Sequence, residues 1–596
     1  MIDPLPLRHY IKGYTLKYFG KDIKAATDVA LVGIPQSMAF AAMAGLPSIY
    51  GIMAGAVGTL VAPFFARCSI AVSGPSNATA FMLASFFLVA SPHIQQNPHI
   101  FVPLIIFFAG LACVIGTFVK ATEMLQFVNR SVLVGYITGA ATLMIASQMR
   151  YVLGLNDVSS GSSFFEMAIA IVENLEFVRW QPTFLAGLSL VLYFIFKRYL
   201  KWLPNFALIL VLMSILNWIL CQPWAGGAFT EVRMLSDFTM SDLTVQAPRF
   251  DLIFDNLAEL FPIIVGIAFL SSLEQTVMSK TLAAKTGEPL NINQDTFSVG
   301  MANIASSFST CLPSSASLTR SILNYNAGAK TRFSAVYCGL IGFGIIFVLA
   351  NFPLISFIPH TVLAALVLAN ALALFDKTQL RICYRSTPGD AAVLIATFLA
   401  ALMLPLHIAI FIGVVISVSL FLRKASKPEL SEYTFDDKGT LTELDDKSER
   451  VIPQISIVHV EGDIFFGASD LFRRQVARIV EEPSLAIIVL RMRNARNLDA
   501  TSVFALEELI TFTREQGRHL IISGASREVY RILRKSGVLN VLQANCDKSQ
   551  SNIFLTEPRN PNVSTRRALM RAQELIGTGD VDISIYTTTK KNEAGK

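Results

Sequence analysis

The stretch that decides how this chain folds reads Ala66-Arg-Cys-Ser-Ile-Ala-Val-Ser-Gly-Pro-Ser-Asn-Ala78. It begins as an alternating, strand-like run and then meets Gly74-Pro75, where a regular helix cannot continue. A second interrupted stretch reads Ser309-Thr-Cys-Leu-Pro-Ser-Ser-Ala-Ser-Leu-Thr-Arg320, and its polar residues lead into a short helix. Two interruptions at matching positions of two halves are typical of a site at the interface of inverted repeats in a membrane protein.

The composition around both stretches suits a lipid bilayer. Of the 596 residues, 53% are hydrophobic and 15% are charged. Apolar stretches such as residues 101–119 and 203–220 approach the roughly 20 residues that cross about 30 Å of hydrocarbon. These features predict an α-helical polytopic membrane protein rather than an ordinary soluble protein.

The pattern of apolar segments predicts fourteen spans in a seven-plus-seven arrangement. The expected spans are residues 23–44, 48–65, 74–90, 100–120, 128–149, 181–198, 203–221, 256–280, 293–311, 317–328, 332–352, 358–375, 389–405 and 408–423. With the N-terminus inside, most Lys and Arg residues fall in inner loops, except Arg150, Arg233 and Arg249. This charge distribution predicts cytoplasmic N- and C-termini in a plasma membrane, the inner membrane in a bacterium. The first 20 residues lack an apolar core or cleavage site, so we expect no secretory signal peptide.

Composition shifts divide the chain into five expected parts. Residues 1–22 form a cytoplasmic segment, and 23–424 form a transmembrane domain with repeats at about 23–221 and 251–424. An acidic, solvated linker at 425–450 is expected to hold a short hairpin around Asp437-Lys-Gly. Residues 451–557 show an α/β pattern, with strands at 455–460, 464–466, 486–491 and 519–523 and helices after Ser469, from Ser502 and from Arg527. The tail at 558–596 is expected to be disordered.

Motifs for catalysis, ATP hydrolysis or metal binding are absent from the sequence. The seven cysteines form no CxxC pair, the seven histidines no HExxH motif, and there is no GxxxxGK[ST] loop. We therefore expect no enzyme, no cofactor and no structural metal. The net charge of +6 is small for this length, and nothing suggests binding of nucleic acid.

A short helix that begins near mid-membrane presents free backbone N–H groups and the positive end of its dipole, and both favour an anion. We expect two such helices, starting near Ser76 and Ser317, to face each other. Hydroxyl and amide side chains in both stretches can donate hydrogen bonds without adding negative charge. The alternative is that they only cap helices or permit close packing. The candidate anion-binding residues here are Ser73, Gly74, Ser76, Asn77, Ala78, Ser315, Ala316, Ser317, Leu318, Thr319 and Arg320.

Four further polar or aromatic positions have more than one interpretation. Arg320 either attracts the anion or extends its charge to the cytoplasmic surface. Glu274 lies in an apolar span, so it should be protonated, bind Na⁺ or pair with Arg320. Gln36 and Phe40 share a helix face and either line the pocket or pack in the core.

The sequence resembles the SulP family, also called solute carrier family 26, over nearly its whole length. The motifs are Pro35-Gln-Ser-Met-Ala-Phe40, Gly45-Leu-Pro-Ser-Ile-Tyr-Gly51, Ser73-Gly-Pro-Ser76, Ser272-Leu-Glu274, Gln294-Asp295, Gly300-Met-Ala-Asn-Ile304, Ser315-Ala-Ser-Leu-Thr-Arg-Ser321 and Asn326-Ala-Gly-Ala-Lys-Thr331. Their order and spacing are more specific than any one motif.

The resemblance implies an inverted repeat divided into a core, spans 1 to 4 and 8 to 11, and a gate, spans 5 to 7 and 12 to 14. It implies an anion site between spans 3 and 10 with Gln36 and Phe40 beside it, and it puts Glu274 at the position tied to cation coupling. The soluble part resembles a STAS domain, with a cytosolic partner to be expected, and a homodimer with an elevator-like movement is implied.

Two positions depart from relatives with known motifs. Ala500 stands where antagonists of anti-sigma factors have a phosphorylatable serine, which argues against that switch. Met278 stands where sodium-dependent bicarbonate relatives have a hydroxyl residue, which favours proton coupling.

The sequence thus predicts a secondary transporter of small anions in the sulfate, bicarbonate or dicarboxylate class, coupled to protons or working by exchange. The alternatives are an uncoupled channel or exchanger on the same scaffold and a membrane-anchored STAS protein with a regulatory role. A nucleobase carrier is disfavoured by the hydroxyl-rich site and the soluble domain.

Overall fold

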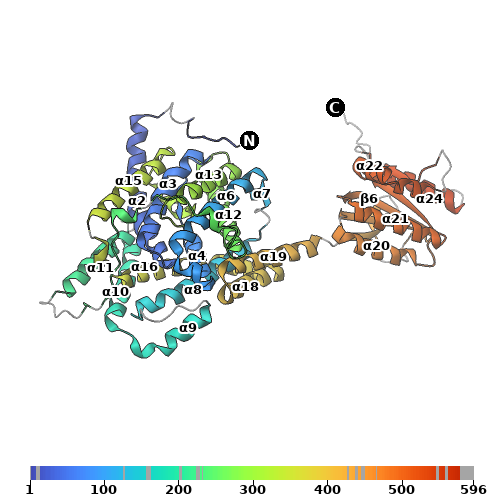
Figure 1. Cartoon of the computed structure of the whole chain (residues 1–596). Helices are drawn as coiled ribbons and strands as arrows, with labels where there is room; N and C mark the ends of the chain where they lie inside the picture. Colours follow the sequence, from blue (N-terminus) through green and yellow to red (C-terminus); the bar gives the residue numbers. More distant parts are fainter. Residues whose placement is uncertain are drawn as a thin grey trace, which may run out of the picture. The chain divides into compact units, whose positions relative to one another are not determined.

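The chain forms a helical unit and an α/β unit (Figure 1), which we describe from a computed structural model. The two compact units are Met1–Val418 and Ser419–Lys596. The structure describes residues 2–8, 14–124, 128–155, 163–199, 205–222, 229–230, 232–243, 245–352, 354–425, 429–435, 441–444, 450, 452–464, 466–544, 550–557 and 562–577.

The first unit is almost entirely helical. Its first half contains α2 (Leu16–Met43), α3 (Ser48–Phe65), β1 (Ser73–Pro75), α4 (Asn77–Val89), α5 (Pro92–Gln96), α6 (Pro98–Phe118), α7 (Ala121–Met124), α8 (Arg130–Val152), α9 (Phe164–Glu173), α10 (Trp180–Tyr199) and α11 (Asn205–Leu220). Its second half contains α12 (Leu257–Thr286), α13 (Ile292–Ser306), β2 (Ser314–Ala316), α14 (Leu318–Asn326), α15 (Phe333–Asn351), α16 (His360–Ala373), α17 (Lys377–Ser386), α18 (Pro388–Met403) and α19 (Leu406–Ala425).

Each of the fourteen predicted spans coincides with one of these helices, and the third and tenth with a short strand and the half-helix after it. Among the described residues, eight helical segments are long and apolar enough to cross a membrane, namely α2, α3, α6, α8, α12, α15, α16 with α17, and α19. Helices α4, α11 and α18 are apolar but shorter. Hydropathy located these helices because a bilayer requires continuous apolar surface.

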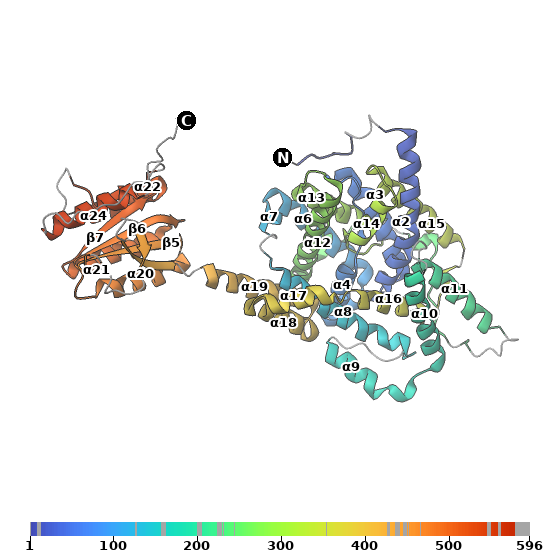
Figure 2. The ribbon, with the colours of Figure 1, turned by 180° about the vertical axis from the view of Figure 1, so that it is seen from behind.

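The contacts between helices repeat in the two halves. Helix α3 of the first half packs on α15 of the second, and the corresponding helix α13 of the second half packs on α6 of the first. In the same way α2 contacts α15, and its counterpart α12 contacts α6. The same correspondence holds for α2 with α14 and α12 with α4, and for α8 with α18 and α16 with α10. These matched pairs are what an inverted repeat requires. Figure 2 shows α2, α4 and α14 close together within the unit.

The second unit contains a six-stranded sheet in the order β4-β3-β5-β6-β7-β8. The strands are β3 (Glu429–Phe435), β4 (Leu441–Glu443), β5 (Ile455–Asp463), β6 (Ile487–Arg496), β7 (His519–Ala525) and β8 (Ile553–Leu555). Strands β5 to β8 are parallel, whereas β3 is antiparallel to both β4 and β5. The helices are α20 (Phe466–Val480), α21 (Ala500–Glu515), α22 (Arg527–Ser536), α23 (Val538–Gln543) and α24 (Val563–Ile576).

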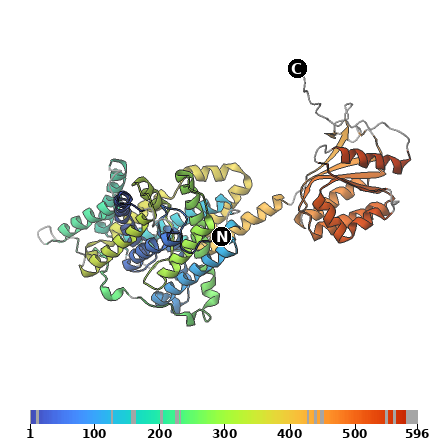
Figure 3. The same ribbon diagram turned by 90° about the horizontal axis from the view of Figure 1, so that it is seen from above.

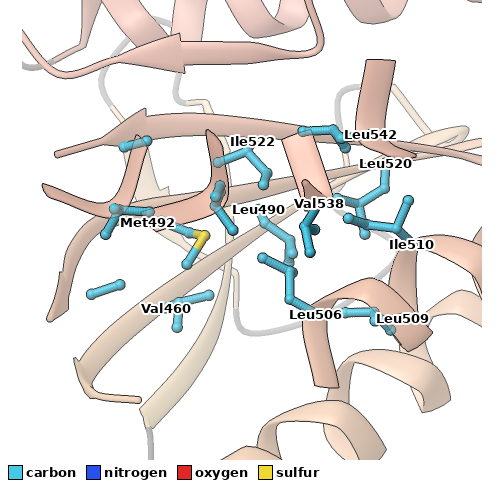
Figure 4. Packing of buried hydrophobic residues seen from close by; sticks show 14 of the residues in the cluster. Val460, Leu490, Met492, Leu506, Leu509, Ile510, Leu520, Ile522, Val538 and Leu542 are labelled. Carbon is cyan, nitrogen blue, oxygen red and sulfur yellow. The ribbon is translucent and has the colours of Figure 1, made fainter. Parts of the chain in front are cut away.

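Helices cover both faces of this sheet, as Figure 3 shows. One face packs on α20 to α23 through a core that includes Val460, Leu490 and Leu506 (Figure 4). The other face packs on α24 through Val489, Ile521 and neighbouring apolar residues. Val489 and Leu490 leave opposite faces of β6 and are both apolar, as in parallel strands that are covered on both faces.

Three expectations for the soluble part were wrong. The expected strand at 464–466 does not form, because Ile464 follows β5 and Phe466 already begins α20. The segment at 425–450 is not a solvated linker, because it supplies β3 and β4 to the sheet. The expected hairpin around Asp437-Lys-Gly is confirmed in its two paired strands, while its turn at 436–440 lies outside the described residues. The tail expected to be disordered contains α24, whose Ala568, Leu569 and Ala572 are buried against the sheet. Its apolar positions recur at helical spacing within a polar composition.

Candidate functional site

The two interrupted stretches lie side by side as a two-stranded antiparallel sheet. Strand β1 pairs with β2 in a register that puts Gly74 opposite Ser315, with Ser73 opposite Ala316. Asn303 of α13 binds β2 through two hydrogen bonds to Ser314. Its side-chain N–H donates to the Ser314 carbonyl at 2.8 Å, and its side-chain oxygen accepts from the Ser314 N–H at 2.7 Å. The site is therefore built from both halves of the unit.

Each strand leads directly into a half-helix that a serine caps. Ser76 is the N-cap of α4 and accepts from the Thr79 N–H, and Ser317 is the N-cap of α14 and accepts from the Arg320 N–H. The expected helix starts near Ser76 and Ser317 are confirmed. In both helices the serine hydroxyl oxygen accepts a hydrogen bond from the third backbone N–H group of the first turn, as the side chain of an N-cap residue does.

Two N–H groups at the start of each half-helix remain available. Within the described part of the chain, no hydrogen bond involves the backbone N–H groups of Asn77 and Ala78 in α4, or of Leu318 and Thr319 in α14. Four unsatisfied donors and two helix dipoles thus come together beside β1 and β2. This arrangement can bind an anion by backbone groups alone.

The corresponding residues of the two interrupted stretches are buried to similar extents. Ser73, Gly74, Ser315 and Ala316 of the strands are buried. The helix starts at Ser76, Asn77, Ala78, Ser317 and Leu318 are half-buried, and Thr319 is exposed. The first turns of the half-helices are therefore the accessible part of the site. The Asn77 Oδ1 atom is buried without a hydrogen-bond partner.

Arg320 lies inside the protein rather than at a surface. Only 2% of it is exposed, and its Nη2 donates to the Pro75 carbonyl at 2.6 Å. The interpretation that Arg320 extends its charge to the cytoplasmic surface is wrong, because the β1–β2 pair brings the Pro75 carbonyl within its reach. The guanidinium connects α14 to the end of β1 and adds positive charge beside the half-helices.

Glu274 of α12 reaches the same strands. Its carboxylate accepts a hydrogen bond from the Ser315 hydroxyl, and Ser76 and Arg320 are further polar neighbours. Among the described residues, no atoms of Glu274 and Arg320 come within ion-pair distance. The alternative in which Glu274 pairs with Arg320 is therefore not seen in the structure.

The predicted residues of α2 lie on the neighbouring wall. Helices α2 and α12 each contact both half-helices. Gln36 is half-buried, whereas Phe40 is 6% exposed. The cavity of about 20 Å³ beside α2 is lined by Ser37, Thr59 and Arg320. It is large enough for about one water molecule.

Several polar residues that hold the site were not among the predicted site residues. Thr59 of α3 donates to the Ser73 carbonyl at 2.6 Å, and Thr79 donates to the Pro313 carbonyl at 3.2 Å. Ser321 accepts from the Val72 N–H at 2.9 Å. The sequence signal that could have identified these residues is a polar side chain inside an apolar helix, since such a group needs a hydrogen-bond partner in a membrane.

Comparison with family models gives two matches. The model described as "Sulfate permease family" matches residues 19–397, and the model described as "STAS domain" matches residues 447–558. The first match alone covers more than half of the chain.

Two curated relatives match along most of their length. The "Putative sulfate transporter YvdB" of Bacillus subtilis is 25% identical over 537 residues, which are 89% of this chain and 96% of the relative. "Sulfate transporter 4.1, chloroplastic" of Arabidopsis thaliana is 24% identical over 563 residues, 91% of this chain and 80% of the relative.

Solved structures share the fold. The murine Solute Carrier 26 family member A9 anion transporter in the inward-facing state has a TM-score of 0.82 and 19% identity, covering 96% of this chain and 94% of that chain. The transmembrane domain of the cyanobacterial bicarbonate transporter BicA has a TM-score of 0.57 and 16% identity, covering 68% of this chain and 98% of that chain. The helical unit is thus a multi-pass membrane domain, and the chain belongs to a transporter family rather than to an enzyme family. It is a member of the sulfate permease family of anion transporters with a C-terminal STAS domain.

Proposed function

We propose that this chain is a secondary active transporter of sulfate that binds the anion at the starts of α4 and α14 and couples its movement to protons through Glu274. The four unpaired N–H groups of these two helices carry the proposal. A doubly charged oxyanion can accept from several of them at once, and the two dipoles favour its charge.

Sulfate is chosen within the wider class of small anions because of the relatives. The Bacillus and Arabidopsis proteins are named as sulfate transporters. Backbone N–H groups recognise charge and size loosely, so bicarbonate and small dicarboxylates are the competitors to test. If the protein strongly prefers bicarbonate or a small dicarboxylate, that anion would replace sulfate as the proposed substrate, and the proposed binding site would stay the same.

Proton coupling is supported by the surroundings of Glu274. The carboxylate has a hydroxyl partner in Ser315 and forms no ion pair within the described residues. Neutralising it by a proton would reduce repulsion with an arriving anion, because like charges in a membrane interior repel strongly. Met278, one helical turn further along α12, offers no oxygen for Na⁺.

For the mechanism we propose that α2 to α6 and α12 to α15 form a core that carries the site past a gate formed by α8 to α11 and α16 to α19. The paired contacts α2–α15 and α12–α6 within the core, and α8–α18 and α16–α10 within the gate, support this division. We further propose a homodimer in the plasma membrane with both termini in the cytoplasm.

Uptake of radiolabelled sulfate into proteoliposomes tests the site. Thr319→Phe puts a ring in front of the α14 start without removing the Ser317 cap, and we expect uptake to be lost. Asn326→Phe, at the exposed end of the same helix, is the matched control and should transport normally. Normal uptake by folded Thr319→Phe protein would exclude the helix starts as the binding site.

The proton gradient tests coupling separately. An inward proton gradient should drive concentrative sulfate uptake by the wild-type protein, whereas Glu274→Gln should only equilibrate sulfate. Uptake that ignores the gradient in both proteins would indicate an uncoupled channel. A protein with no anion flux at all would instead favour a regulatory role for the STAS domain.

A further inference from the structure

Buried arginines of the soluble unit are normally paired with carboxylates. Arg450 donates to Glu432 at 2.9 Å and to Glu482 at 2.7 Å. Arg571 donates to Glu574 at 2.9 Å. Arg450 is 8% exposed and Arg571 is 6% exposed. Both guanidinium groups therefore have a negative partner where water cannot fully solvate them.

Arg491 of β6 is equally buried, at 7% exposure, but it has no such partner. Its Nη2 donates to the Asn562 side-chain oxygen at 3.4 Å, and the guanidinium lies 5.8 Å from the centre of the Tyr433 ring. Its Nε–H is buried without an acceptor. Among the residues the structure describes, no carboxylate lies within ion-pair distance of Arg491.

Two more unsatisfied polar groups lie around this side chain. Arg491 and Ser523 are directly paired in the register of β6 and β7, so their side chains leave the same face of the sheet. That face is the one on which α24 packs, because Val489 and Ile521, two residues earlier on each strand, contact α24. The Ser523 hydroxyl is buried without a hydrogen-bond partner.

The third group comes from α24. Thr565 shares its helix face with Ala568, Leu569 and Ala572, at spacings of three, four and seven residues, and these residues pack on the sheet. Its hydroxyl is likewise buried without a partner. Thr565 is in the first turn of a 14-residue helix, so the positive end of the α24 dipole lies at the same place.

An arginine charge, two hydroxyl groups and a helix start thus lie on one face of the sheet, and no carboxylate of the described residues is within ion-pair distance of the arginine. Burial, and secondarily the nearby Arg493, lower the pKa of Arg491 below the ordinary arginine value. Unpaired buried charge and unsatisfied buried polar groups are both costly, and an anion would relieve all of them at once.

We propose that the STAS domain binds a small oxyanion of the sulfate or phosphate class between β6, β7 and the first turn of α24. Arg491 supplies the charge, with its Nε–H as a donor, and the hydroxyls of Ser523 and Thr565 donate to the anion oxygens. The oxyanion is either a free inorganic ion or the phosphate of a larger molecule such as a nucleotide. The site is separate from the transport site and does not depend on the proposed transport function.

Hydrogen–deuterium exchange of the full-length protein in detergent tests the proposal. Sulfate, phosphate and ADP are added separately to buffer that contains no other multivalent anion. Peptides from β6 and from residues 562–577 should exchange more slowly, by about tenfold at ten times the dissociation constant. Slowing by sulfate and phosphate identifies a free ion, and slowing by ADP alone identifies a phosphate carried on a larger molecule. Both results support the oxyanion site, and no slowing with any of the three overturns it.

Variants distinguish this site from the membrane site and from a purely structural role. Arg491→Gln should abolish the effect on α24, while Arg474→Gln, at an exposed arginine paired with Asp470, should retain it. Peptides covering residues 314–326 report the transport site and should respond to sulfate in both variants. In anion-free buffer Arg491→Met should melt no lower than the wild-type protein, because it removes an unpaired buried charge. Lower melting of Arg491→Met, together with no anion effect on the wild-type protein, would show that Arg491 only holds the fold.

Discussion

Replacing Gly74 by alanine tests whether the hydrogen bond from Arg320 to the Pro75 carbonyl organises the proposed anion site. A Cβ atom at position 74 would lie 2.8 Å from Nη1 and 3.0 Å from Nη2 of Arg320. Ordinary contact begins near 3.4 Å, so the guanidinium must retreat by about 0.6 Å (3.4 − 2.8). That movement competes with the 2.6 Å hydrogen bond to Pro75.

The expected effect follows from the strength of this bond. A hydrogen bond with a charged donor contributes about 1.5–3 kcal/mol, and its loss corresponds to roughly 10- to 150-fold in affinity. We therefore expect Gly74→Ala to raise the KM for sulfate uptake in proteoliposomes within that range, with normal amounts of folded protein on size-exclusion chromatography.

Gly33 faces the same arginine from α2 and controls for the added methyl group, whereas only Gly74, at a φ of +158°, also strains the backbone when substituted. A Cβ atom at position 33 would be 3.4 Å from Cδ of Arg320, which is an ordinary contact. Gly33→Ala should therefore leave KM nearly unchanged. A wild-type KM for Gly74→Ala, or an equal loss in both variants, would show that the Arg320–Pro75 bond does not determine anion affinity.

The soluble domain gives two further predictions. Arg450→Met should destabilise it by about 3 kcal/mol, because two carboxylates lose their buried partner, and thermal unfolding should show this, whereas Arg474→Met at the surface should change little. Asp499 is the N-cap of α21, and burial of its carboxyl group raises its pKa. Hydrogen bonds from the Ser502 N–H and hydroxyl and from the Phe466 N–H have the opposite effect. They outweigh burial, so the pKa of Asp499 lies below the ordinary aspartate value. Its stabilisation is complete above that ordinary value and is lost as the pH falls through the lower folded-state pKa. Asp499→Asn should therefore unfold more easily at neutral pH and lose less stability than the wild-type protein on acidification, and a melting series across pH that shows parallel curves would contradict this.

Local sequence signals predicted the positions of the half-helices well. Gly74-Pro75 ends one regular segment, and Ser76 and Ser317 are residue types that cap helices. Both helices begin directly after these residues, which are their N-caps. The apolar spans were equally accessible, because hydropathy acts over a continuous window of about 20 residues.

Long-range pairing was not accessible in the same way. Strands β1 and β2 have three residues each, and 238 residues separate Pro75 from Ser314, so no local pattern marks them as partners. The partners of Arg320 and Asn303 depend on that pairing and could not be assigned. Helix α24 was missed for another reason, since its apolar positions are diluted by the polar residues of the surrounding tail.

The β1–β2 pair has a thermodynamic consequence for transport. Because the strands are hydrogen-bonded to each other and Arg320 attaches α14 to Pro75, the two helix starts cannot separate without breaking this small sheet. If the site moves between the two sides of the membrane as proposed above, an anion meets the same donors on either side, and these donors contribute equally to its intrinsic dissociation constant there. Such a carrier works in either direction, and the concentrations and the coupled ion alone decide which way the net flux runs.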